Sequence, residues 1–197
     1  MTPVNWSNHT IEYEEAADLL LDNMIRTQRQ NLVFPTIFLY RHYIELMLKE
    51  IVLNNWTYLH LSGKGSKDLN GQKLVHRRFP SGHDIYKLWK MCREALQETD
   101  KLVDSQFAES QEYIKEIIQT YDALEADLNK FAKIDPDSEH FRYPVDTEGK
   151  PIVIDKRLLT ELLGELPELV KRISYNLNGI SVGIYTILQN KYDALAQ

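Results

Sequence analysis

The segment Tyr40–Leu46 contains Arg41, His42 and Glu45, residue types that bind anions and transfer protons. If the segment is helical, these three residues lie within about one turn of one another. On a helix with about 100° per residue, one sector roughly 100° wide holds four polar and two apolar side chains: Arg41, His42, Glu45, Lys49, Phe38 and Val52. Arg41 and Glu45 therefore lie among core residues, where an unpaired charge is costly. Two interpretations follow: a buried network that determines helix packing, or a pocket in which Arg41 holds an anion and His42 exchanges protons.

A second candidate is the segment Arg77–Asp84, which reads Arg-Arg-Phe-Pro-Ser-Gly-His-Asp. Two guanidinium groups precede a helix start, where free N–H groups and the helix dipole favour an anion. His83 could supply an acid or a base there. The alternative is that His83 and Asp84 only cap the helix.

A third candidate is Arg142, which lies between Phe141 and Tyr143. An arginine flanked by aromatic residues can stack on a base or clamp a phosphate or a carboxylate. It can also pair with Asp137 or Glu139 and hold a short ribbon against the helices.

Other chemistries lack their motifs. The chain has no Gly-x-Ser-x-Gly, no phosphate-binding glycine loop followed by Lys-Ser or Lys-Thr, and no His-Glu-x-x-His. The six histidines are scattered without ligand spacing: His9, His42, His60, His76, His83 and His140. We therefore expect neither a metal ion nor a cofactor.

Helical spacing of apolar residues predicts an all-α fold, an antiparallel bundle of five or six helices. Helices are expected at about 10–29, 34–54, 84–99, 105–133 and 156–190, with a break or kink at Pro167. A basic loop excursion is expected at about 55–82, in which residues near Trp56, Tyr58 and Leu74 could form a hairpin. A short β-hairpin is expected near 141–154.

Composition is that of one globular domain spanning residues 1–197, with a net charge of −6. The stretch Ser62–Arg78 carries five cationic side chains against Asp68, a local charge of +4 on an acidic protein. The net negative charge of the chain argues against a general nucleic-acid coat protein, because that role usually requires a basic surface. Cys92 is expected to be a buried core residue. No signal peptide or membrane span is apparent, so a cytoplasmic protein is expected.

The elements Arg41-His42-x-x-Glu45-Leu46, Gly82-His83-Asp84 and Phe141-Arg142-Tyr143-Pro144 resemble those of uncharacterised bacterial proteins of the HEPN superfamily. Catalytic members carry an Arg followed, after four to six residues, by a His; Arg78 and His83 have four residues between them, and Arg77 and His83 have five. The resemblance implies metal-independent RNA hydrolysis at a dimer interface. His83 would exchange the proton, while Arg77 or Arg78 would stabilise the pentacovalent phosphate.

Three functions stay open at this point. The first is a noncatalytic module of a prokaryotic defence or toxin–antitoxin type system. It would bind RNA, a nucleotide or a protein partner encoded nearby through a polar cleft that carries Arg41, His42, Glu45, His83 and Arg142, with Asp84 and Tyr143 as further ligand-binding candidates. The second is an endoribonuclease that uses Arg77, Arg78 and His83. The third is a structural interaction subunit. A homodimer is expected from the family, with the apolar segment Ile180–Leu188 as a possible contact.

Overall fold

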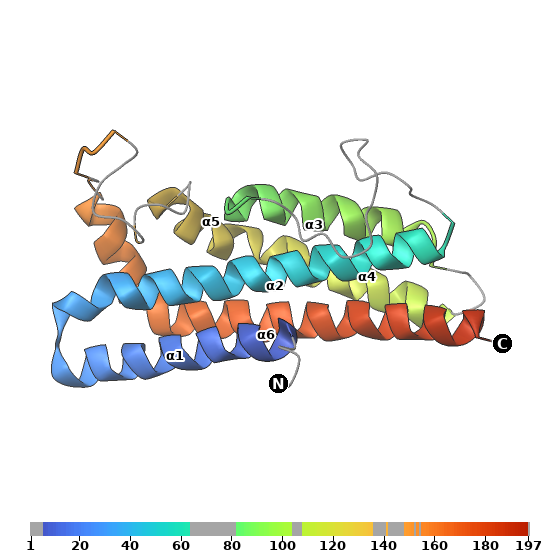
Figure 1. The fold of residues 1–197 in the computed structure, drawn as a ribbon, viewed down its shortest axis with the longest axis horizontal. Coiled ribbons are helices and arrows are strands. Elements are labelled where there is room, and N and C mark those ends of the chain that lie inside the picture. The colour runs from blue at the N-terminus through green and yellow to red at the C-terminus, as the bar shows by residue number, and fades with distance from the viewer. Residues whose placement is uncertain are drawn as a thin grey trace.

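A computed structural model describes residues 6–63, 82–103, 108–135, 141, 148–151, 153 and 155–196. These residues are mostly helical, as Figure 1 shows, which confirms the all-α prediction. The helices are α1 (Trp6–Thr27), the short 3-10 helix η1 (Gln30–Leu32), α2 (Val33–Leu61), α3 (Ile85–Asp100), α4 (Ala108–Ala123), α5 (Glu125–Ile134) and α6 (Lys156–Leu195). Most of the expected hairpin near 141–154 lies outside the described residues.

Helix α2 is the central element, because it packs against α1, α3 and α6. Its sequence is apolar nearly all round, and side chains on every face are buried, which is the pattern of a helix inside a core. Pro35 lies in its first turn, where the missing N–H costs little.

The loop excursion begins later than the sequence indicated, because residues 55–61 belong to α2. Tertiary contacts stabilise this extra length. Asn55 is buried and its side-chain oxygen accepts a hydrogen bond from Thr99 Oγ1 at 2.9 Å, while Tyr58 Oη donates to the Leu102 carbonyl at 3.3 Å. The possible hairpin near Trp56 and Tyr58 was therefore wrong.

Helices α2 and α3 run in the same direction. Cys92 Sγ donates to the Leu48 carbonyl, Thr99 to Asn55, and Tyr58 to Leu102, and each of these pairs is separated by 44 residues in the sequence. A constant difference is the mark of parallel neighbours, so this pair departs from the antiparallel arrangement expected from the sequence.

Helix α1 is antiparallel to α2, and α5 is antiparallel to α6, whereas α2 and α6 run in the same direction, as Figure 1 shows. Tyr40 of α2 donates to Asp18 of α1, and the more C-terminal His42 meets the more N-terminal Tyr13. Arg172 and Glu165 of α6 pair with Asp127 and Lys130 of α5 in the same reversed order. Figure 1 shows α1 beside α2 and α6.

The stripe expected as one helix at 105–133 is divided between α4 and α5 at Leu124. The Leu124 N–H donates to the Tyr121 carbonyl three residues back, which tightens the turn, and α5 then starts a new helix. Helix α6 is continuous through Pro167. It changes direction in its N-terminal part, the part that contains this proline, as Figure 1 shows.

The core contains Cys92, which is fully buried as expected. Burial raises the pKa of its thiol to about 12. Close by, the rings of Trp89 and Tyr121 stack with centroids 3.6 Å apart. Within the described residues, every helix is too short or too polar to cross a membrane.

Candidate functional site

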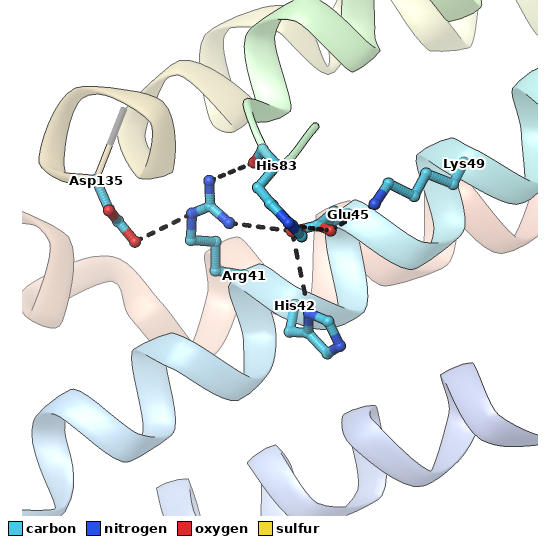
Figure 2. A network of polar contacts seen from close by, with 6 residues as sticks. All are labelled: Arg41, His42, Glu45, Lys49, His83 and Asp135. Atoms are coloured by element: carbon cyan, nitrogen blue, oxygen red, sulfur yellow. Dashed lines mark hydrogen bonds and ion pairs between the residues drawn. The ribbon is translucent and has the colours of Figure 1, made fainter. Parts of the chain in front are cut away.

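Six polar side chains meet where α2 passes the start of α3 and the end of α5, and Figure 2 shows them together. We call this group the polar cluster; it consists of Arg41, His42, Glu45, Lys49, His83 and Asp135. Four members come from one helix, because positions 41, 42, 45 and 49 repeat at helical spacing. His83 lies just before α3 and Asp135 just after α5, and the packing of these helices on α2 brings both residues to the cluster.

Arg41 is buried, with an exposed fraction of 2%, and its guanidinium group contacts Glu45, His83 and Asp135 among the described residues. Nη1 lies 3.3 Å from Glu45 Oε2, Nη2 donates to the His83 carbonyl at 2.6 Å, and Nε lies 3.2 Å from Asp135 Oδ2. The guanidinium group therefore connects α2 to the residue before the α3 cap and to the end of α5. These contacts are those of a buried network, which was the first of the two interpretations of this segment.

Glu45 accepts contacts on both carboxylate oxygens. Lys49 Nζ and His83 Nδ1 each lie 2.8 Å from Oε1, and His42 Nδ1 lies 4.0 Å from Oε2. Burial on its own would raise the pKa of Glu45, but hydrogen bonds and charge from Lys49 and His83 outweigh it, so the pKa is lowered. Glu45 is thus ionised at neutral pH.

His83 forms the solvent-facing edge of the polar cluster, because half of its side chain is exposed. An ionised carboxylate at Nδ1 favours the tautomer with the proton on that nitrogen, so Nε2 is left as an acceptor. Within the part of the chain that the structure describes, Nε2 has no partner. This geometry positions one imidazole nitrogen for proton exchange or for hydrogen bonding to a ligand.

The backbone on both sides of His83 determines where the ring lies. Gly82 has a φ of +99°, in the left-handed region that favours glycine. Asp84 is the N-cap of α3 and accepts a hydrogen bond from the Lys87 N–H at 3.0 Å, so the capping expected of it is present. The chain therefore turns at Gly82, presents His83 and enters α3.

His42 lies on the α1 side of α2. The edge of the Tyr13 ring meets it with centroids 4.4 Å apart, and Phe38 stacks at 5.8 Å. Its side chain is mostly buried. His42 is therefore packed between aromatic rings, with one nitrogen near Glu45.

The charges of the buried part of the cluster balance. Arg41 and Lys49 contribute two positive charges, and Glu45 and Asp135 contribute two negative charges. All four residues are buried. Removing one member would leave an uncompensated charge in the interior, which costs several kcal/mol.

Of the residues predicted to form a site, Arg41, His42, Glu45 and His83 come together, and Asp84 caps the adjacent helix. Arg77, Arg78, Arg142 and Tyr143 lie outside the described residues. The ligand-binding roles of Arg41 and Glu45 stay predictions; both side chains are interior, so their effect on a ligand would act through His83.

The sequence analysis did not assign a role to two members of the cluster. Lys49 was placed in the right helical sector, and its spacing of four from Glu45 was the available signal. Asp135 directly follows α5 and precedes a proline, which marks a helix end but carries no sign of a distant arginine. Among the residues that the structure covers, no three His, Cys, Asp or Glu side chains are grouped so that they could hold a metal ion.

No family model, curated protein or solved structure matches this chain. The resemblance to the HEPN superfamily therefore depends on the three sequence elements alone.

Proposed function

We propose that this chain is a noncatalytic HEPN-like module of a prokaryotic defence or toxin–antitoxin type system, and that it binds RNA at the surface around His83. The observation that carries the proposal is the position of His83: buried Glu45 contacts Nδ1, and half of the side chain is exposed. Arg77 and Arg78 lie just upstream in the sequence and would neutralise backbone phosphates. A nucleotide or a protein partner is the alternative ligand for this surface.

Arg41 is not proposed to contact the RNA directly. Its guanidinium group is buried and already contacts Glu45 and Asp135. Its positive charge is therefore already paired with buried carboxylates. Arg41 also donates a hydrogen bond to the backbone carbonyl of His83.

The test is fluorescence anisotropy with labelled single-stranded RNA across a range of salt concentrations. We expect His83→Ala and Arg78→Ala to weaken binding several-fold, and Arg78→Ala to lower the slope of log K against log salt by about one. His60→Ala is the matched control, because this exposed histidine lies at the far end of α2. Equal affinity of all four proteins, or no binding at low salt, would refute the proposal.

The second candidate function is metal-independent cleavage of RNA. It is supported by the contact of Glu45 with His83 Nδ1, because a carboxylate that orients an imidazole leaves Nε2 able to take a proton from a ribose 2′-hydroxyl. Arg77 or Arg78 would stabilise the phosphate. Incubating total RNA with the pure protein in EDTA tests this, and activity that disappears in His83→Ala supports it.

The third candidate is a structural subunit in which the polar cluster only determines packing. Charge balance within the buried part of the cluster supports it. Arg41→Met separates this candidate from the first: a large loss of stability with unchanged RNA and partner binding would favour the structural subunit.

The proposal also includes a single cytoplasmic domain and a homodimer formed through the C-terminal half of α6. The range Ile173–Asn190 contains no charged residue, yet Val182 and Tyr185 are exposed. Tyr185→Lys should convert a dimer to a monomer in light scattering coupled to size-exclusion chromatography. A wild-type monomer at micromolar concentration would refute this part.

A further inference from the structure

A large cavity lies apart from the polar cluster, between α1, α2, α4 and α6. Its volume is about 780 Å³, which is within the range of small-molecule sites. Helix α2 lines it with Tyr40, Tyr43 and Ile44, a different face from the one that carries Arg41 and Glu45. The cavity is thus a second, separate feature of the fold.

Carboxylates dominate the charge of this cavity. Glu14 and Asp18 lie one turn apart on α1, and Glu116 faces them from α4. Among the described residues of the lining, Lys171 is the one cation, and its Nζ lies 3.6 Å from Glu168 at the surface. Three negative charges against one positive charge give these described lining residues a formal charge of −2.

The two carboxylates on α1 are held by neutral donors. Tyr40 Oη donates to Asp18 Oδ1 at 2.5 Å, and Ser174 Oγ donates to Glu14 Oε1. Tyr43 Oη in turn donates to Ser174 Oγ at 3.2 Å. The acids are therefore held in position by neutral donors, and no ion pair joins them to a cation within the described part of the chain.

The surroundings of Glu14 disfavour its ionised form. Its pKa is raised, first by burial and also by the charges of Asp18 and Glu15, although hydrogen bonds from Ser174 and Tyr43 oppose the shift. A positive group placed beside Glu14 would stabilise its ionised carboxylate.

Aromatic rings complete the lining. Tyr113 of α4 and Tyr175 of α6 line the cavity and are partly or largely exposed, so they form its rim. A cation over the face of a tyrosine ring is attracted by the negative charge of the π system. Carboxylates beside tyrosine rings are thus suited to an alkylammonium group, whose carbon chain also contacts the apolar wall.

We propose that this cavity binds a small organic cation, an alkyl amine that carries one or more ammonium groups. Its ammonium contacts Glu14 and Asp18, and Tyr175 covers it from the rim. This site is independent of RNA binding at His83, so either proposal can fail without the other.

The test is isothermal titration calorimetry of the full chain with butane-1,4-diamine, and with butane-1,4-diol as the uncharged probe of equal length. We expect saturable binding of the diamine and none of the diol. Comparable binding of the two probes, or no heat with the diamine at millimolar concentration, overturns the proposal.

Variants locate the site. Glu14→Gln should weaken diamine binding about tenfold, because a hydrogen bond to a charged group contributes more than a neutral one. Glu15→Gln is the matched control: it removes the same charge from the next position of α1 but does not line the cavity. Equal loss in both variants overturns the proposal, because it would show a nonspecific effect of net charge.

A second variant tests the site independently in case Glu14→Gln does not fold. Tyr175 is 81% exposed, so Tyr175→Ala should fold normally and still bind the diamine several-fold more weakly. Unchanged affinity in Tyr175→Ala, with the melting temperature also unchanged, contradicts the proposed position of the ammonium group.

Discussion

Replacing Glu45 with Gln should destabilise the protein by about 3 kcal/mol at neutral pH, which is in the range for breaking a buried ion pair. The structure supports this magnitude, because Glu45 is 1% exposed and its carboxylate faces Arg41 on one oxygen and Lys49 and His83 on the other. Glutamine keeps the shape but removes the charge. Within the polar cluster, Asp135 is then the carboxylate that remains beside two buried cations.

The assay is urea unfolding followed by circular dichroism, and the control is Glu161→Gln. Arg157 and Glu161 have the same four-residue spacing as Arg41 and Glu45, but their side chains are 87% and 56% exposed. The control should change stability by no more than about 0.5 kcal/mol. A loss below about 1 kcal/mol in Glu45→Gln, with an unchanged slope of free energy against urea, would refute the reasoning.

The pH dependence adds a second readout. The pKa of Glu45 is lower in the folded protein than its ordinary value, so its stabilisation is complete above that ordinary value and disappears as pH falls through the folded pKa. The difference between wild type and Glu45→Gln should therefore be largest near neutral pH and narrow in acid. A difference that stays constant down to acid pH would show that shape, not charge, accounts for the loss.

The remaining predictions concern packing. Gly183→Ala should lower stability by about 1–2 kcal/mol in urea unfolding, because the added Cβ would lie 2.6 Å from Ile117 Cδ1. In the control Gly179→Ala the added Cβ meets nothing within 4 Å, so this variant should be neutral or stabilised by up to about 1 kcal/mol. The same result for both variants would contradict the close packing of α4 and α6. Cys92 should resist a thiol reagent in the native protein and react after denaturation, and fast labelling without urea would count against its burial. Asp84→Ala should cost about 1 kcal/mol in thermal unfolding by removing the cap of α3, while an unchanged melting temperature would argue against that cap.

Local pattern was enough to predict part of the candidate site. Arg41, Glu45 and Lys49 share a helical face because of their spacing, and the apolar residues around them showed that this face is buried. The pairing of Arg41 with Asp135 could not be predicted in this way. The two residues lie far apart in the sequence, and their contact depends on where the end of α5 lies against α2.

The C-terminal end of α2 shows why an element boundary can be missed. Asn54 and Asn55, followed by aromatic residues, are typical of a loop when only local preference is considered. In the fold, Asn55 pairs with Thr99 and Tyr58 reaches the Leu102 carbonyl. Contacts with α3 therefore outweigh the weak helix preference of these residues.

The amino-acid sequence alone determined that this protein is helical, where most helices lie, and that Cys92 and the face of Arg41 point inward. These properties follow from residue periodicity along one chain segment, and periodicity is local. Only the tertiary structure decided that α3 runs parallel to α2, that His83 meets Glu45, and that Glu14 and Asp18 line a cavity with tyrosines from other helices. Such contacts join residues distant in the sequence, so they depend on how whole helices pack together and not on the preference of any one segment.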